Sequence, residues 1–294
     1  MLCANMSEVD ISIVTVGFKS CEYVRELLNS LFTARGNLSI EYFILDNASG
    51  DGLIEMVEKE FVPRVDERLK IFALQNLENF GFAKANNMGI ARARGRYILL
   101  LNPDMRLFPD TLTNMVTWMD TNAQAGIAGC KLITQTGAVQ PHVRRFPGVV
   151  DQLAIMLKIP HVWPGVLNSY LATDFDYDST VRVDSIRGSF FMIRRSVIEK
   201  LGELDERFFI WFEEVDYCKQ AAANNFEVWF TNAATCIDHV GRSFSLVGGL
   251  QKQKYFTDSM IKYFAKWHPK SAWIFRALRP FALAGAWAAE KMHI

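Results

Sequence analysis

Continuous apolar runs alternate with segments of helical period along the first hundred residues. Segments 20–34, 53–60 and 82–94 carry apolar or small side chains three or four positions apart, which indicates helices with one buried face. The segments between them are predicted strands, and 11–16 and 97–101 are continuous apolar runs, as expected for strands buried on both faces of a parallel sheet. The predicted strands cover residues 11–16, 41–45, 69–74 and 97–101. The pattern predicts an α/β fold with a doubly wound, mostly parallel sheet flanked by helices.

The pattern loosens after residue 104. Residues 141–178 mix prolines, aromatic and polar residues without a clear period, and this predicts a loop-rich insertion. We expect residues 1–245 to form one domain whose two halves meet near residue 104, and residues 246–294 to form a helical tail. The further expected elements are helices at 109–121, near 150–157 and at 214–224, strands at 127–133, 226–230 and 234–237, a hairpin at 134–139 and an extended segment at 183–194.

Polar residues end two of the predicted strands. Asp46 follows the 41–45 run, and Asn102, Pro103 and Asp104 follow the 97–101 run. Pro103 has no backbone N–H to donate to a ladder, so the strand must stop there. Open α/β sheets bind ligands at the carboxyl ends of their strands, which makes both acids candidate site residues. A simple Asx turn would explain either residue alone.

A glycine- and asparagine-rich segment opens the helix before the 97–101 strand. Gly81 permits a positive φ or a close backbone approach, and Lys84 with the helix N-terminus makes an anion site plausible. Tight turns and close helix packing are the alternative explanation for the same residues.

Several of these segments, in fixed order, resemble glycosyltransferase family 2. Within that family they are most similar to rhamnosyltransferase-type members that build bacterial surface polysaccharides. The likeness covers about residues 11–242 and rests on segments 46–49, 79–89, 101–104, 144–147, 188–195, 205–209 and 212–216, and on His239.

The resemblance implies a GT-A type fold, a nucleotide-diphosphate sugar donor, a divalent metal and inversion at the anomeric carbon. By position it implies that Asp104 and His239 bind the metal, Mg²⁺ or Mn²⁺, which prefers oxygen ligands and the donor diphosphate. Asn102 stands where the first acid of the family's Asp-x-Asp motif is expected, which leaves one carboxylate there. The nucleotide-binding half is then about residues 1–104 and the acceptor-binding half about 105–245. The implied nucleotide-binding residues are Asp46, Asn47, Asn79, Gly81, Phe82, Asn86 and Asn102.

The family also implies a general base in the acidic segment 213–216. An inverting transfer needs a carboxylate that takes the proton of the acceptor hydroxyl, and Glu214 occupies that position with glutamate in place of the more usual aspartate. The helix dipole alone would favour acids in this first turn by about 0.3–1 kcal/mol each. The residues expected to orient groups or contact the acceptor are Glu213, Asp216, Trp211, Gly188, Ser189 and Arg145.

The charge of the chain is zero overall but unevenly distributed. Residues 251–294 hold eight Lys or Arg against two acids and several aromatic residues. We expect 271–289 to be an amphipathic helix at a membrane interface, with packing on the domain or on a second subunit as the alternative. Neutral charge gives no reason to expect a nucleic-acid partner. Glu8 and Asp10 precede the first apolar run, and five scattered cysteines form no Cys-x-x-Cys pair. We therefore expect no signal peptide, and a cytoplasmic protein peripheral on the inner membrane face.

The leading hypothesis is an inverting, metal-dependent transfer of L-rhamnose from dTDP-rhamnose to a polyprenyl-diphosphate-linked saccharide, in O-antigen or cell-wall polysaccharide synthesis. A UDP-linked donor is the first alternative. A sugar nucleotidyltransferase would carry a Gly-rich loop after the first strand, and residues 16–19 do not form one. A non-catalytic, membrane-attached scaffold remains open because of Asn102, as does a homo-oligomer.

Overall fold

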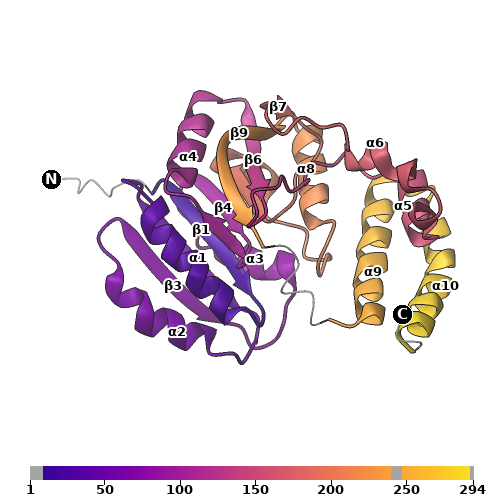
Figure 1. Cartoon of the computed structure of the whole chain (residues 1–294), viewed down its shortest axis with the longest axis horizontal. Helices are drawn as coiled ribbons and strands as arrows, with labels where there is room; N and C mark the ends of the chain where they lie inside the picture. The colour runs from indigo at the N-terminus through magenta and orange to yellow at the C-terminus, as the bar shows by residue number, and fades with distance from the viewer. Residues whose placement is uncertain (1–8, 240–246, 292–294) are drawn as a thin grey trace.

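A computed structural model describes residues 9–239 and 247–291 (Figure 1). Nine strands in the described residues form one sheet in the order β3-β2-β1-β4-β8-β6-β9-β5, with β7 paired to β9. The four strands from β3 to β4 are parallel, and the register sets Gly17 beside Asp46 and Asp46 beside Gln75. Their carboxyl ends therefore meet at one edge of the sheet. Their bounds are β1 Ile11–Gly17, β2 Ile40–Asp46, β3 Leu69–Gln75 and β4 Tyr97–Leu101.

The second half of the sheet is mixed. Strand β8 runs antiparallel to both β4 and β6, while β9 runs parallel to β6 and antiparallel to β5 and β7. Because β8 is antiparallel, it begins at the edge where β4 ends, and Asn102 N donates to Ser189 O at 2.9 Å. The bounds are β5 Met105–Leu107, β6 Ala125–Ile133, β7 Val181–Arg182, β8 Phe190–Arg194 and β9 Glu227–Asp238.

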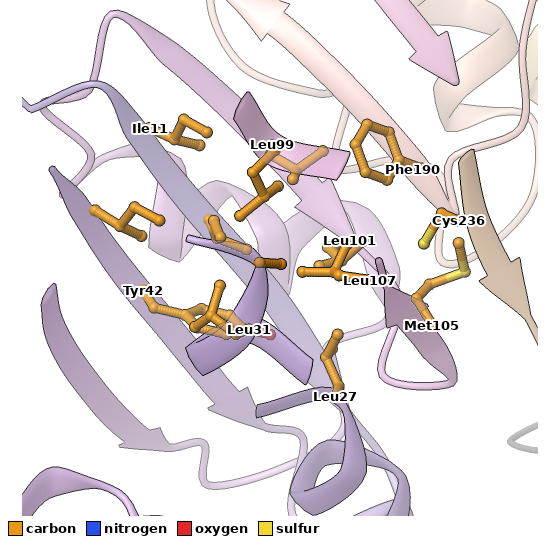
Figure 2. Close-up of a cluster of buried hydrophobic side chains, with 14 of the residues drawn as sticks. Ile11, Leu27, Leu31, Tyr42, Leu99, Leu101, Met105, Leu107, Phe190 and Cys236 are labelled. Atoms are coloured by element: carbon orange, nitrogen blue, oxygen red, sulfur yellow. The ribbon is translucent and has the colours of Figure 1, made fainter. Parts of the chain in front are cut away.

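Helices cover both faces of the sheet. On one face α1, α2 and α4 bury leucine, methionine and valine side chains against the strands; Figure 2 shows part of this core, including Leu27, Leu99 and Phe190. On the other face α3, α7 and α8 complete a second core. The bounds are α1 Cys21–Ala34, α2 Leu53–Glu60, α3 Phe82–Ile90, α4 Thr111–Thr121, α7 Arg195–Leu201 and α8 Glu213–Ala223, with a 3-10 turn η1 at Val62–Arg64.

A helical layer packs beside the sheet at the end that holds α8 (Figure 1). Helix α10 folds back along α9, and Leu250 N donates to the Glu290 carboxylate at 3.4 Å. Met156 of α5 and Phe212 join a third core with residues of both helices, such as Phe264 and Phe275. No helix in the described ranges has the length and apolar composition needed to cross a bilayer. The bounds are α5 Val149–Met156, η2 Ile159–His161, η3 Pro164–Leu167, α6 Asn168–Leu171, α9 Gly249–Trp267 and α10 Ala272–Lys291.

The predicted fold class is confirmed, and some predicted elements are wrong in detail. Helix α3 ends at Ile90 rather than near 94, because the N–H groups of Arg92 and Ala93 bond three residues back instead of four. The expected strands 226–230 and 234–237 form the single strand β9, whose pairing with β6 shifts register between Cys130 and Lys131. The predicted turn at 134–139 is present, with Gly137 at a φ of 83° and Thr134 N donating to Ala138 O at 2.8 Å, but its strands pair through one bridge, between Ile133 and Val139. Strand β5 and helix α7 were not predicted, and the expected helical tail forms two helices, α9 and α10.

Candidate active site

A cavity of about 550 Å³ lies at the edge of the sheet where β1, β2 and β4 end and β8 begins. It collects residues from the sheet edge, from the start of α3, from the loop before α8 and from the first turns of α9. The predicted site residues among its lining are Asn47, Asn79, Gly81, Phe82, Asn102, Gly188, Ser189, Trp211, Glu213 and Glu214. The other lining residues used below are Lys19, Arg187, Phe209, Gln251 and Tyr255.

Asparagine side chains hold the loop before α3 against the end of β2. Asn47 Nδ2 donates to Asn79 Oδ1 at 3.2 Å and to Gly81 O at 3.1 Å. The side-chain oxygen of Asn47, Oδ1, accepts from Asn76 Nδ2 at 2.8 Å, a contact that the sequence did not indicate. These bonds fix the amide groups that face the cavity, because both ends of the Asn47 side chain are held.

Gly81 is required by a close backbone contact. Its φ is 80° and its ψ is −177°, a region occupied essentially by glycine. A Cβ atom here would overlap the carbonyl oxygen of Phe209 and lie 2.7 Å from its ring. The next residue, Phe82, donates its N–H to that same carbonyl at 2.6 Å. The start of α3 is therefore locked to the loop that leads into α8.

Two predicted nucleotide-binding residues do not line the cavity. Asp46 is buried, and its carboxylate accepts from Gln75 Nε2 at 2.9 Å and from the backbone N–H and the hydroxyl of Ser49. Asn86 is buried in α3 and donates to Phe82 O at 2.9 Å. The nucleotide-binding roles of both residues stay predictions.

The two expected metal ligands are brought together by strand pairing. Met105 pairs with Asp238, and His239 N donates to Asp104 O at 3.1 Å. Asp104 is buried and follows Asn102 and Pro103, which line the cavity, whereas neither Asp104 nor His239 is among the lining residues. In the part of the chain that the structure describes, no three His, Cys, Asp or Glu side chains cluster in a way that could hold a metal. The His239 ring is hydrogen-bonded through Nδ1 to Gln135 Nε2 at 2.7 Å. Metal binding by Asp104 and His239 stays a prediction.

The acidic segment starts α8 from a strained backbone. Trp211 and Phe212 have φ values of 64° and 71°, in the left-handed region that costs a non-glycine residue about 1–3 kcal/mol. This turn leads into Glu213 and Glu214, which line the cavity. A Cβ on Gly188 would lie 3.6 Å from both Glu214 Cβ and the Phe82 ring, so the three residues crowd one wall.

Burial sets the protonation of the two glutamates. It holds the pKa of Glu213 well above its ordinary value, and repulsion from Glu214 raises that pKa further. Burial also raises the pKa of Glu214, whereas backbone N–H groups and the nearby Arg187 act to lower it. Both carboxyls are therefore more readily protonated than an exposed glutamate, and Arg187 with the backbone N–H groups favours the ionised form of Glu214.

Polar atoms without hydrogen-bond partners gather at this end of the cavity. Among the described residues, Glu213 Oε2, Glu214 Oε2 and Ser189 Oγ are buried and have no hydrogen-bond partner. Buried polar groups are normally paired, since an unpaired one costs about 1–3 kcal/mol. Three such atoms around one cavity indicate a site that is completed by a polar ligand.

Asp216 and Arg145 lie apart from these acids. Asp216 faces α9, where its carboxylate accepts from Lys266 Nζ at 2.7 Å and Trp267 Nε1 at 2.6 Å. Arg145 lines a separate cavity of about 460 Å³ beside Arg144 and Asp184. Asp216 therefore pairs with a cation at the helical layer, and a direct acceptor contact by Arg145 stays a prediction.

The architecture is that of GT-A glycosyltransferases. The chain belongs to glycosyltransferase family 2, because the sequence model described as glycosyl transferase family 2 matches residues 12–202. It is 24% identical over 223 residues, 74% of the chain, to the low-salt glycan biosynthesis hexosyltransferase Agl10 of Haloferax volcanii. It is 24% identical over 216 residues, 69% of the chain, to the N-acetylglucosaminyl-diphospho-decaprenol L-rhamnosyltransferase of Mycobacterium tuberculosis. The matches span 64% and 67% of these relatives, about two thirds of their length.

A solved structure supports the fold alone. The mannosyltransferase PcManGT from Pyrobaculum calidifontis, in complex with GDP-Man and Mn²⁺, superposes with a TM-score of 0.60 at 17% identity. The superposition covers 97% of this chain and 74% of that one. The likeness therefore extends past residue 202, into α9 and α10, which the family model does not match.

Proposed function

We propose that this protein is an inverting glycosyltransferase and that Glu214 is its general base. The observation that carries the proposal is the set of unpaired buried oxygens of Glu213, Glu214 and Ser189 in a cavity that Asn47 and Asn102 also line. We propose that a nucleotide sugar binds against Asn47 and presents its anomeric carbon toward Glu214.

The reaction follows from these positions. The acceptor hydroxyl oxygen forms a bond to the anomeric carbon while the bond from that carbon to the diphosphate oxygen breaks, and the electron pair leaves with the diphosphate. The proton of the hydroxyl passes to the Glu214 carboxylate. A protonated Glu213 orients its neighbour without adding a second negative charge. Lys19 and Arg187, both at the cavity, are placed to offset the charge of the departing diphosphate.

A divalent cation, Mg²⁺ or Mn²⁺, fits beside Asp104 and His239. When bound, it supplies Lewis-acid stabilisation of the diphosphate leaving group. Asp104 contributes the carboxylate and His239 the imidazole, and Asn102 leaves the site with one fewer acid than an Asp-x-Asp motif would give.

We propose L-rhamnose, carried by dTDP, as the donor sugar, and a polyprenyl-diphosphate-linked saccharide as the acceptor. The name of the mycobacterial relative supports both choices. A membrane-bound acceptor agrees with exposed aromatic residues on α10, among them Trp273, Phe281 and Trp287. We therefore propose that the protein works on the cytoplasmic face of the membrane, with the tail at the lipid surface.

A glutamate-to-glutamine substitution tests the base. Glu214→Gln should abolish transfer and leave nucleotide binding intact, because the amide keeps the shape of the side chain but takes no proton. Glu203→Gln, an exposed acid outside the cavity, is the control and should transfer normally. Near-normal turnover by Glu214→Gln would reject the assignment.

A thermal-shift panel of nucleotide sugars, with and without Mn²⁺, tests the donor. We expect stabilisation by dTDP-rhamnose that grows when Mn²⁺ is added, since a ligand bound by the folded state alone raises the unfolding temperature. A larger shift with a UDP-sugar would change the donor but keep the reaction. Absence of turnover with every bound donor would favour the non-catalytic scaffold.

A further inference from the structure

The first turns of α9 form one wall of the cavity, although they lie beyond residue 202, where the family match ends. We infer that Gln251 and Tyr255 on this wall recognise the acceptor saccharide and so determine acceptor specificity. The inference rests on the proposed function, because it names what binds beside Glu214.

A single stripe of α9 faces the loop that leads to the catalytic acids. Five residues, from Gln251 to Lys266, form this stripe at spacings of four, four, three and four positions, which places them on one side of the helix. Tyr255 stacks on Phe209 with ring centroids 4.5 Å apart and an interplanar angle of 20°. Ser259 Oγ donates to Ile210 O at 2.7 Å. The stripe consists of Gln251, Tyr255, Ser259, Lys262 and Lys266.

The far end of the stripe is anchored to the domain. Lys262 Nζ donates to Arg207 O, and Lys266 Nζ pairs with the fully buried Asp216 at 2.7 Å. An ion pair with a buried partner resists separation, because breaking it would leave an uncompensated charge. Helix α9 is therefore held in a fixed position, and its stripe continues past the anchored part to Tyr255 and Gln251 at the cavity.

The chemistry of this wall suits a sugar ring. A pyranose presents an apolar C–H face and a rim of hydroxyls, and ligand sites pair aromatic surface with a few placed polar groups. Tyr255, Phe209 and Trp211 supply the aromatic surface, and the Gln251 amide supplies one donor pair and one acceptor. Phe209 also packs against Gly81, one of the residues expected to bind the nucleotide, so this wall adjoins the proposed donor site.

Binding measurements can separate this role from general stability. The probe is N-acetylglucosaminyl diphosphate with a short alkyl chain, titrated calorimetrically into full-length protein with nucleoside diphosphate present. We expect Gln251→Ala to raise the Kd for the probe about tenfold, the effect of one lost hydrogen bond and its contacts. Tyr255→Ala should do the same, and Tyr255→Phe should keep most of the affinity. Nucleotide affinity should stay unchanged in all three.

Gln253→Ala is the matched control, because Gln253 is on the same helix but does not line the cavity. An unchanged probe Kd in Gln251→Ala would overturn the inference, as would an equal loss in Gln253→Ala. So would a loss that appears only with a polyprenyl probe, since the wall would then recognise the lipid. Failure of the proposed function is distinct: the probe would bind and respond to Gln251→Ala, yet no nucleotide sugar would be turned over.

Discussion

Replacing Gly81 with alanine tests the contact that closes the site. The backbone at Gly81, with φ of 80° and ψ of −177°, costs any other residue about 1–3 kcal/mol. The new Cβ would also overlap the Phe209 carbonyl, and overpacking of this kind adds about 1–3 kcal/mol. We therefore expect Gly81→Ala to lower the free energy of unfolding by about 2–6 kcal/mol, a large part of a typical total of about 5–15 kcal/mol.

Gly202 provides a matched control. Its φ of 80° and ψ of −163° match those of Gly81, but no atom lies within 4 Å of a Cβ built there. Gly202→Ala should therefore cost only the backbone part, about 1–3 kcal/mol. Urea unfolding followed by circular dichroism measures both variants, and nucleotide affinity should fall in Gly81→Ala alone. Equal unfolding midpoints for the two variants would refute the contact with Phe209.

The remaining predictions concern the base and the tail. Arg187→Met should raise the pKa of Glu214, because the charge of Arg187 lowers that pKa. Since the base must be ionised, activity should then be lost at a higher pH as the medium is acidified. The kcat–pH profile measures this shift, and Arg182→Met, at an exposed arginine, is the control. An unmoved acidic limb would argue against Glu214 as the titrating base. Changing Trp273, Phe281 and Trp287, 65%, 75% and 55% exposed, to serine should weaken binding to phosphatidylglycerol vesicles at least about tenfold in a flotation assay. Leu77→Ser, at a side chain 96% exposed in the loop after β3, should have no effect; equal effects would contradict a membrane role for α10.

The sequence predicted the strands of the parallel half closely, since each is a short segment dominated by apolar residues between two helical segments. It missed β5, a strand of three residues, because so short a run carries no periodic signal. It split β9 in two, because Thr231 and Asn232 interrupt the apolar pattern where the strand pairing changes register. A strand can continue through such an irregularity in its pairing, but the irregularity interrupts the hydrophobic pattern from which the strand is predicted.

The candidate site likewise has a part that the sequence predicted and a part that it missed. The segments ending at Asn47, Gly81 and Asn102, with the acids of α8, line one cavity as their motif order suggested. The wall formed by α9 was missed because its inward stripe contains Gln251, Ser259 and two lysines, which hydrophobic periodicity assigns to solvent. The anchor of that stripe is an ion pair, Asp216 with Lys266, and pairings between residues distant along the chain leave no local pattern.

Strand β8 imposes an order on how the chain can assemble. Strands β1 to β4 use contiguous sequence and can pair as soon as residue 101 is available. Strand β6 reaches β4 only through β8, whose residues 190–194 are synthesised about sixty positions later, and the partner β9 comes later still. A ribosome-bound chain stopped before residue 190 should therefore hold a protected amino-terminal half while β6 remains open to proteases. Glu214, the proposed general base on α8, therefore reaches its place in the site only after β8 has joined the sheet.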